Sequence, residues 1–165
     1  MAGLTLDETA RALGHVVWLE EQCFELLGRW GPASTERDEP DRDEPDPETT
    51  LLLARLSRGH GERARALAEL LPDTRDHHPD ASVAPAAEPW RTRLAEAATT
   101  APPDRRGVAA ALTAAVLADE ERILAAAGPV GDEPLRRRLS WAVVGGRQDL
   151  DELGRKPAEG GSGRR

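Results

Sequence analysis

The residues of this sequence that could do chemistry are ionisable side chains set into apolar helical stripes, and Glu20 is the first of them. Over residues 5–30 the apolar side chains recur at intervals of three and four, the spacing of a helix face packed in a bundle. That stripe consists of Leu6, Ala10, Leu13, Val17, Phe24 and Leu27, with Glu20 in the remaining place. A carboxylate among such neighbours is desolvated, at a cost of several kcal/mol, unless a cation, a metal or a proton compensates it.

Two interpretations of Glu20 stay open. It is either a metal ligand or one half of an inter-helix salt bridge, for which Arg63 and Arg122 are the candidate partners. Glu21 and Glu25 flank it, so an error of ~20–40° in helix phase would move Glu20 to the boundary of the stripe.

A second and a third candidate ligand follow from the later helical stripes. His60 lies on the stripe of the second predicted helix, where a neutral imidazole can bind a metal or serve as a hydrogen-bonded core residue. In the third predicted helix, one acid among Asp119, Glu120 and Glu121 must approach the core. We therefore take Glu20, His60 and Glu120 as the candidate metal site, which would hold iron or manganese if the ligand set is intact.

The ligand set for a pair of metal ions is incomplete. A carboxylate-bridged pair needs Glu-x-x-His, because residues i and i+3 share one helix face. Ser57 holds the place of that glutamate before His60, and no histidine follows His78 to supply a second motif. The pair Gly145-Gly146 in the last predicted helix indicates close helix approach, although Asp149 could still face inward.

The remaining polar clusters give weaker predictions. Asp76-His77-His78 lies in a proline-rich segment and is interpreted as a polar linker, and His15 as a surface or boundary residue. Cys23 has no neighbouring arrangement that would make it a nucleophile. The sequence contains no Gly-rich phosphate loop and no zinc-ligand spacing, so we assign no catalytic residue. We expect no cofactor, except iron or manganese if the candidate metal site is intact.

Helices must position these residues. Long helices are predicted at 5–30, 48–71, 105–127 and 133–153, and a short one at 89–99. Thr5 with Glu8 resembles a capping box, and Asp104 is a candidate cap for the third long helix. No segment alternates with period two, so no sheet is expected.

The lengths of the helices and their links predict the fold class. Four long helices of similar length, one tight link and one long crossover favour an all-α fold, namely an antiparallel four-helix bundle of ferritin-like connectivity with a short extra helix in the long crossover. We expect residues 1–153 to form this domain, with a disordered acidic loop at 33–47 and a disordered tail at 154–165.

Charge and composition limit the partners. The net charge is −8, and residues 36–48 alone hold eight acids and two arginines. No sustained basic patch is present, so nucleic acid is not an expected partner. No apolar run approaches 18 residues and Cys23 is the single cysteine, so we expect no membrane partner and a cytoplasmic location.

Several segments resemble a known group. They are similar to segments of the ferritin-like domain proteins of high-G+C bacteria, which belong to the di-iron carboxylate bundle superfamily. The similar segments are Leu13–Trp30 in the first helix, Leu51–His60, the Gly128–Asp132 link and Leu135–Val144. The resemblance implies that Glu20 matches the first-helix ligand and His60 the second-helix histidine. Ser57 and the Gly-Gly-Arg-Gln stretch before Asp149 depart from the expected acidic ligands.

Two functions follow from these observations. The first is a non-enzymatic ferritin-like module with degenerate metal ligands, which acts through self-association as a homodimer or through a protein partner. The second is a metal-dependent oxidase or hydroxylase of the di-iron type with a non-standard ligand set. The acidic repeat and the missing ligands favour the first.

Overall fold

The computed structural model describes residues 4–31, 46–83, 88–128 and 132–155. Most of the predicted acidic loop, and nearly all of the predicted tail, lie outside these residues. Within them the chain is helical, and the pairing of Thr74 with His77 is an isolated bridge with no strand around it. The prediction of an all-α protein is therefore confirmed.

The long helices are α1 (Leu6–Trp30), α2 (Pro47–Ala68), α5 (Arg105–Ala126) and α6 (Glu133–Gly154). Three short elements lie between α2 and α5, namely α3 (Pro79–Ser82), α4 (Glu88–Ala98) and the 3-10 turn η1 (Pro102–Asp104). α3 was not predicted, and α2 ends three residues before the predicted Leu71.

The starts of the helices follow from local capping chemistry. Thr5 and Glu8 form the predicted capping box at the start of α1. At α2 the Asp46 carboxylate accepts hydrogen bonds from the backbone N–H groups of Glu48, at 2.8 Å, and Thr49, at 3.3 Å. Asp104 is the N-cap residue of α5, as predicted, but its side chain accepts no capping bond from the described residues of α5.

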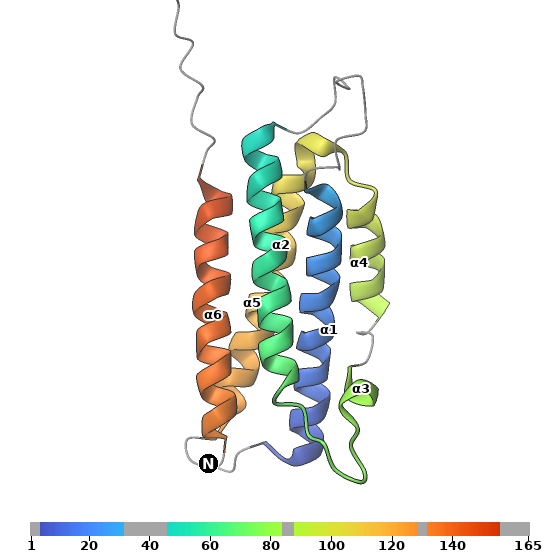
Figure 1. Ribbon diagram of the computed structural model, residues 1–165, viewed down its shortest axis with the longest axis vertical. Helices are drawn as coiled ribbons and strands as arrows, with labels where there is room; N and C mark the ends of the chain where they lie inside the picture. Colours follow the sequence, from blue (N-terminus) through green and yellow to red (C-terminus); the bar gives the residue numbers. More distant parts are fainter. Residues whose placement is uncertain (1–3, 32–45, 84–87, 129–131, 156–165) are drawn as a thin grey trace, which may run out of the picture.

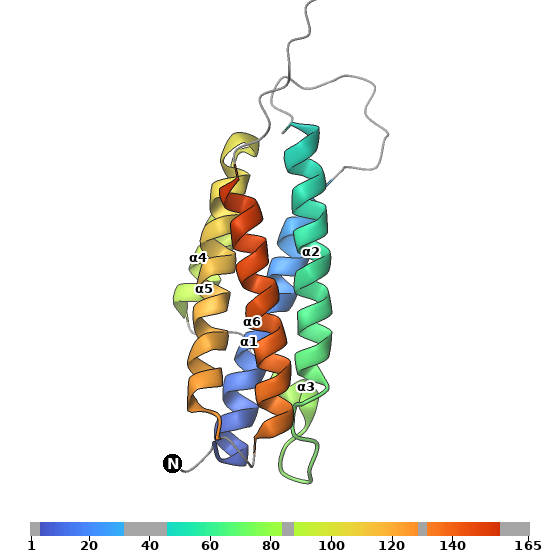
Figure 2. The same ribbon diagram turned by 90° about the vertical axis from the view of Figure 1, so that its left-hand side faces the viewer.

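The four long helices lie side by side along the long axis of the molecule (Figures 1 and 2). In Figure 1, α1 and α6 run upward, whereas α2 and α5 run downward. α1 packs on α2 and α5, and α6 packs on α5 and α2, so every helix lies next to antiparallel neighbours. This arrangement directs one face of each long helix toward a common centre.

The segment between α2 and α5 returns along the outside of α1 (Figure 1). α3 contacts α1 so closely that a Cβ atom at Gly14 would lie 1.9 Å from the carbonyl oxygen of Ser82. Further along, Trp90 and Leu94 of α4 pack against the core. Because glycine has no Cβ, Gly14 is what allows the crossover to approach α1 here.

The core forms two apolar clusters along the axis, one around Leu19, Leu27 and Leu53 and the other around Leu13, Leu67 and Leu139. The predicted stripe of α1 was wrong at both Leu6 and Phe24, whose exposed fractions are 50% and 47%. Leu6 is the first residue of α1.

Phe24 is exposed because the buried face of α1 turns toward α4 in the second half of the helix. Leu19, Leu26 and Trp30 are buried there, in the cluster to which Trp90 and Leu94 of α4 contribute. That face lies away from Phe24, whose ring instead contacts the outside of α2 at Gly61.

Candidate functional site

The candidate ligands Glu20, His60 and Glu120 all lie in the interior between the long helices. Glu20 comes from α1, His60 from α2 and Glu120 from α5, and their exposed fractions are 0%, 0% and 1%. The Oε2 atom of Glu20 is hydrogen-bonded to Nδ1 of His60. Glu120 lies near Glu20, close enough for the Glu20 carboxylate to raise its pKa. The three residues predicted to face the interior therefore do so. Their assignment as metal ligands stays a prediction.

Arg63 also enters this cluster, from the helix turn that follows His60. Its Nε donates to Oε1 of Glu20 at 2.7 Å, and its Nη1 donates to Oδ2 of Asp149, on α6, at 2.8 Å. The salt bridge of Glu20 with Arg63, one of its two candidate partners, is thus confirmed. The expectation that Asp149 could face inward is confirmed as well. The other candidate partner, Arg122, instead donates to Asp119 at 2.5 Å.

The bonding around His60 assigns its tautomer. A carboxylate oxygen can only accept, so the proton lies on Nδ1 and is donated to Glu20. Nε2 then accepts from the Thr113 hydroxyl at 3.3 Å. Because Nδ1 carries its proton, the 3.0 Å approach of Arg63 Nη2 to that atom is a contact and not a hydrogen bond.

Small residues around Arg63 make room for its guanidinium. A Cβ atom added at Gly145 would lie 3.3 Å from Nη1 of Arg63, and one at Gly59 would lie 3.5 Å from the same atom. A Cβ at Gly146 would lie 3.4 Å from Leu117 Cδ1, which agrees with the close helix approach expected from this pair. The glycines of α6 thus serve both the packing of α5 and the space that Arg63 occupies.

The buried charges of Glu20 and Arg63 stabilise each other. Burial alone would raise the pKa of Glu20, yet its electrostatic interactions and hydrogen bonds with His60 and Arg63 outweigh burial and hold that pKa below its usual value. Burial likewise opposes the charge of Arg63, but Glu20 and Asp149 raise its pKa above the ordinary range. Both groups are therefore ionised at neutral pH.

Glu120 behaves in the opposite way. Burial raises its pKa to about 9, and the Glu20 carboxylate beside it adds to the rise through its charge and a hydrogen bond. Its Oε1 has no hydrogen-bond donor among the described residues. A protonated Glu120 can donate to Glu20, which explains how a carboxyl group without a donor of its own is tolerated at this depth.

The other residues singled out in the sequence lie elsewhere. Ser57 donates to the backbone oxygen of Phe24 at 2.7 Å and so joins α2 to α1. His77 donates to Asp7, in the first turn of α1, at 2.6 Å, and His15 bonds Asp119 at 3.2 Å. Burial raises the pKa of the Cys23 thiol, which agrees with its not being a nucleophile.

Thr113 is the member of the cluster that sequence reasoning missed. It lies one helical turn before Val116 and two turns before Glu120 in α5, so it shares their inward face. A hydroxyl residue at a core position of an otherwise apolar stripe was the available signal, because a buried polar group needs a partner.

A pair of metal ions does not fit this donor set as it stands. Arg63 already supplies a positive charge to Glu20, and the Nδ1 face of His60 is directed at the same carboxylate. Glu120 is in its neutral form, which is a poor metal ligand. Within the described residues, no group of three or more His, Cys, Asp or Glu side chains has the arrangement of a metal site.

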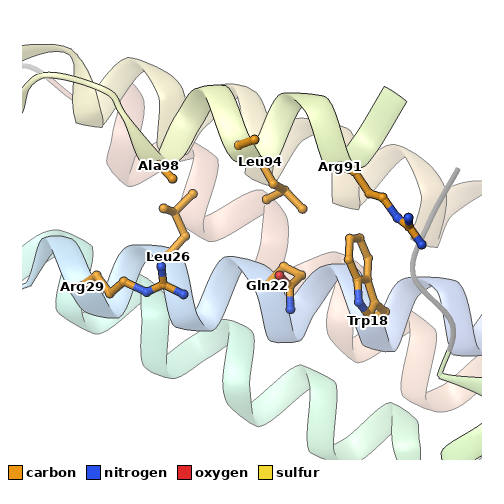
Figure 3. A pocket seen from close by; sticks show the side chains of 8 residues that line it. Trp18, Gln22, Leu26, Arg29, Arg91, Leu94 and Ala98 are labelled. Atoms are coloured by element: carbon orange, nitrogen blue, oxygen red, sulfur yellow. The ribbon is translucent and has the colours of Figure 1, made fainter. Parts of the chain in front are cut away.

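A separate groove lies between α1 and α4 (Figure 3). Trp18, Gln22 and Leu26 of α1 face Leu94 and Arg91 of α4 across it. Its lining contains no acid, histidine, cysteine or serine, so it lacks the side chains for acid–base or nucleophilic chemistry.

Comparisons with known protein families, with curated proteins and with solved structures find no match for this chain. None of the helices in the described part of the chain is both long and apolar enough to cross a membrane.

Proposed function

We propose that this chain is a non-catalytic, ferritin-like four-helix bundle that acts through association with a protein partner or with itself. The order of helix directions supports the ferritin-like connectivity, since α1 and α2 form one antiparallel pair, α5 and α6 form another, and a single long crossover joins them. The single cysteine and the absence of a sustained basic patch support a cytoplasmic protein that does not bind nucleic acid.

The observation that carries the proposal is the place of Arg63. Its guanidinium bonds Glu20 and Asp149 in the interior, where a di-iron bundle would need free carboxylate and imidazole ligands. A buried carboxylate requires a positive charge, and here an arginine supplies it permanently. The centre of the bundle is then a structural ion-pair network, so we place the function on the surface.

Exposed apolar side chains support the association. Phe24, Leu51, Trp141 and Val144 are between 47% and 66% exposed on the long helices. Trp141 and Val144 lie one helical turn apart on the outside of α6, so they form one apolar patch. Contiguous apolar surface of this kind marks protein contacts more often than chance exposure does.

The alternative is a metal-dependent oxidase or hydroxylase that holds iron or manganese through Glu20, His60 and Glu120. The convergence of these three side chains, and the Glu120 oxygen without a donor among the described residues, favour it. In that case Arg63 would have to leave the carboxylate of Glu20 before a metal could bind.

Metal analysis of the protein, purified without chelator and again after addition of Fe(II) or Mn(II), separates the two functions. We expect well below one metal ion per chain in both samples. About two ions per chain, the content of a di-iron bundle, would overturn the non-catalytic proposal. As a second measurement, we expect E20Q to lower the free energy of unfolding equally with and without added metal.

The role of Arg63 itself is tested by R63M. Removing one partner of a buried ion pair leaves the other charge uncompensated, so we expect the free energy of unfolding to fall by about 3–5 kcal/mol. The matched control is R58A on the same helix, whose exposed ion pair with Glu62 is worth at most about 1 kcal/mol. The double variant R63M/E20Q should lose less than the sum of the two single losses, and strict additivity would contradict the network.

A further inference from the structure

The outer face shared by α1 and α2 carries a groove of about 730 Å³. Its least exposed lining is made of small residues of α2, namely Ala54, Ser57, Gly61 and Ala64. Phe24 projects into it from α1, and Glu21 and Arg65 are exposed lining residues on opposite helices. We call this surface the α1/α2 groove.

Phe24 is the main apolar feature of the groove. Its ring contacts α2 at Gly61, where an added Cβ would lie 2.9 Å from Cδ2 of Phe24. Even so, 47% of the side chain is exposed. The groove therefore presents an aromatic ring next to small residues. The ring is a protrusion and the small residues form a depression on the same face.

The charges of the groove are arranged in the same complementary way. Arg58 and Glu62 pair with each other at 2.9 Å on α2. Glu21 on α1 and Arg65 on α2, by contrast, form no ion pair with any residue that the structure describes, and the neighbouring charge that acts on Glu21 is that of another acid, Glu25. The contacts of Glu20 with Arg63, and of Phe24 with Gly61, show that Glu21 and Arg65 lie at a similar level along the bundle. One face thus offers an uncompensated acid and an uncompensated base side by side.

A second copy of this chain fits such a face. A twofold axis parallel to the helices, between α1 and α2, would set α1 of each copy against α2 of the other at the same level. Glu21 of one copy would then face Arg65 of the other, twice per dimer, and each Phe24 ring would meet the small residues of the opposite groove. An interface that repeats one patch in this way must be self-complementary in shape and in charge.

We propose that the α1/α2 groove is the contact surface of a homodimer, closed by reciprocal Phe24 packing and reciprocal Glu21–Arg65 ion pairs. This inference rests on the proposed function and names its partner as a second copy of the chain. The groove is the surface that combines an exposed aromatic ring with Glu21 and Arg65 on opposite helices.

Sedimentation velocity of the full chain over a range of concentrations tests the dimer, with metal content measured on the same samples. We expect a dimer that dissociates on dilution, and F24S should raise its dissociation constant at least about tenfold. W141S, which alters an equally exposed aromatic on α6, should leave it unchanged. A chain that is monomeric at all concentrations, or a dimer lost in W141S and kept in F24S, would overturn the proposal.

The charge arrangement is tested by E21R and R65E. Each variant alone sets like charges against each other at both contacts, so we expect both to be monomeric or weakened at least about tenfold. An equimolar mixture of E21R with R65E restores both pairs between unlike chains, and we expect it to dimerise. A mixture that stays monomeric while the parent chain dimerises would contradict the twofold arrangement.

The failure of this inference is distinguishable from the failure of the proposed function. A metal-free monomer would refute the dimer and leave the non-catalytic assignment in place. A dimer with about two metal ions per chain would do the reverse.

Discussion

At the scale of single residues, the interior of this protein contains a network of ionisable side chains from four helices, and each side chain affects the charge of its neighbours. Glu20 is ionised because His60 and Arg63 stabilise its charge, and Asp149 holds the far side of the same guanidinium. Glu120 stays neutral because burial, and then the negative charge of Glu20 beside it, raise its pKa by more than Arg63 lowers it. Within this network Arg63 supplies the positive charge that Glu20 and Asp149 share, and Glu120 adds no further negative charge while it is protonated.

The proton on Glu120 predicts a pH dependence of stability. Its pKa is about 9 in the folded protein against the ordinary 4.5, so the folded state binds a proton that the unfolded state has released between these values. The stabilisation is complete below about pH 4.5 and is lost as the pH rises toward 9, by at most ~1.4 kcal/mol per pH unit.

Denaturant titrations at pH 6, 7 and 8 measure this dependence. We expect the parent chain to lose stability across the series, with a shallower loss in E120Q, whose amide cannot ionise. Glu20, Arg63 and Asp149 face the same carboxyl group, and Glu20 and Arg63 stay charged over this range. Parallel slopes in the two proteins would show that Glu120 is ionised in the folded state.

At the scale of elements, the crossover between α2 and α5 depends on how closely it can approach α1. Gly14 lies where the carbonyl of Ser82 would meet any Cβ, and α4 then covers the second half of α1. Leu26 faces α4 and is buried, whereas Phe24 is 47% exposed. One glycine and one short helix thus decide which face of α1 is buried and which forms the groove.

Two alanine substitutions test this packing. G14A would place a Cβ 1.9 Å from Ser82 O, so we expect it to displace the crossover and to lower the free energy of unfolding by about 1–3 kcal/mol, as other overpacked sites do. G107A is the matched control in α5, where no described atom lies within 4 Å of the added Cβ. It should raise the stability by about 0.5–1 kcal/mol, since alanine favours a helix more than glycine does. Equal effects of the two changes would contradict the close approach.

At the scale of the whole molecule, the interior polar network lies within a core made of two apolar clusters. The cluster around Leu53 contains Trp30 and adjoins Trp18 and Trp90, while the cluster around Leu139 lies toward the other end. α1 contributes to both clusters and to the network between its ends. A helix shared in this way should couple the two ends in one cooperative unit.

Large-to-small substitutions at the two ends test that coupling. L53A and L139A each remove a fully buried side chain, so each should lower the free energy of unfolding by about 2–5 kcal/mol. Tryptophan fluorescence mainly reports the Leu53 end, whereas far-ultraviolet circular dichroism reports all helices. We expect the two transitions to coincide in both variants. A fluorescence transition that separates from the dichroism in either variant would indicate that the ends unfold independently.

The sequence by itself determined the long helices and most of the positions that face the interior. Spacing placed Glu20, His60 and one of the acids around Glu120 on inward faces, and Arg63 was one of two candidate partners. These are local properties, because the period of a helix fixes which side chains share a face. The bounds of α1 and α5 were accurate within a residue for the same reason.

Only the tertiary structure decided how those faces meet. Distances between different helices decided that Arg63, and not Arg122, pairs with Glu20. They also brought Asp149 and Thr113 into the network and made Glu120 neutral. The exposure of Phe24 depends on where α4 packs, and a stripe read along one helix contains no information on its neighbours. Glu20 therefore stood out in the sequence as a buried charge, and the packing of four helices supplied the arginine that balances it.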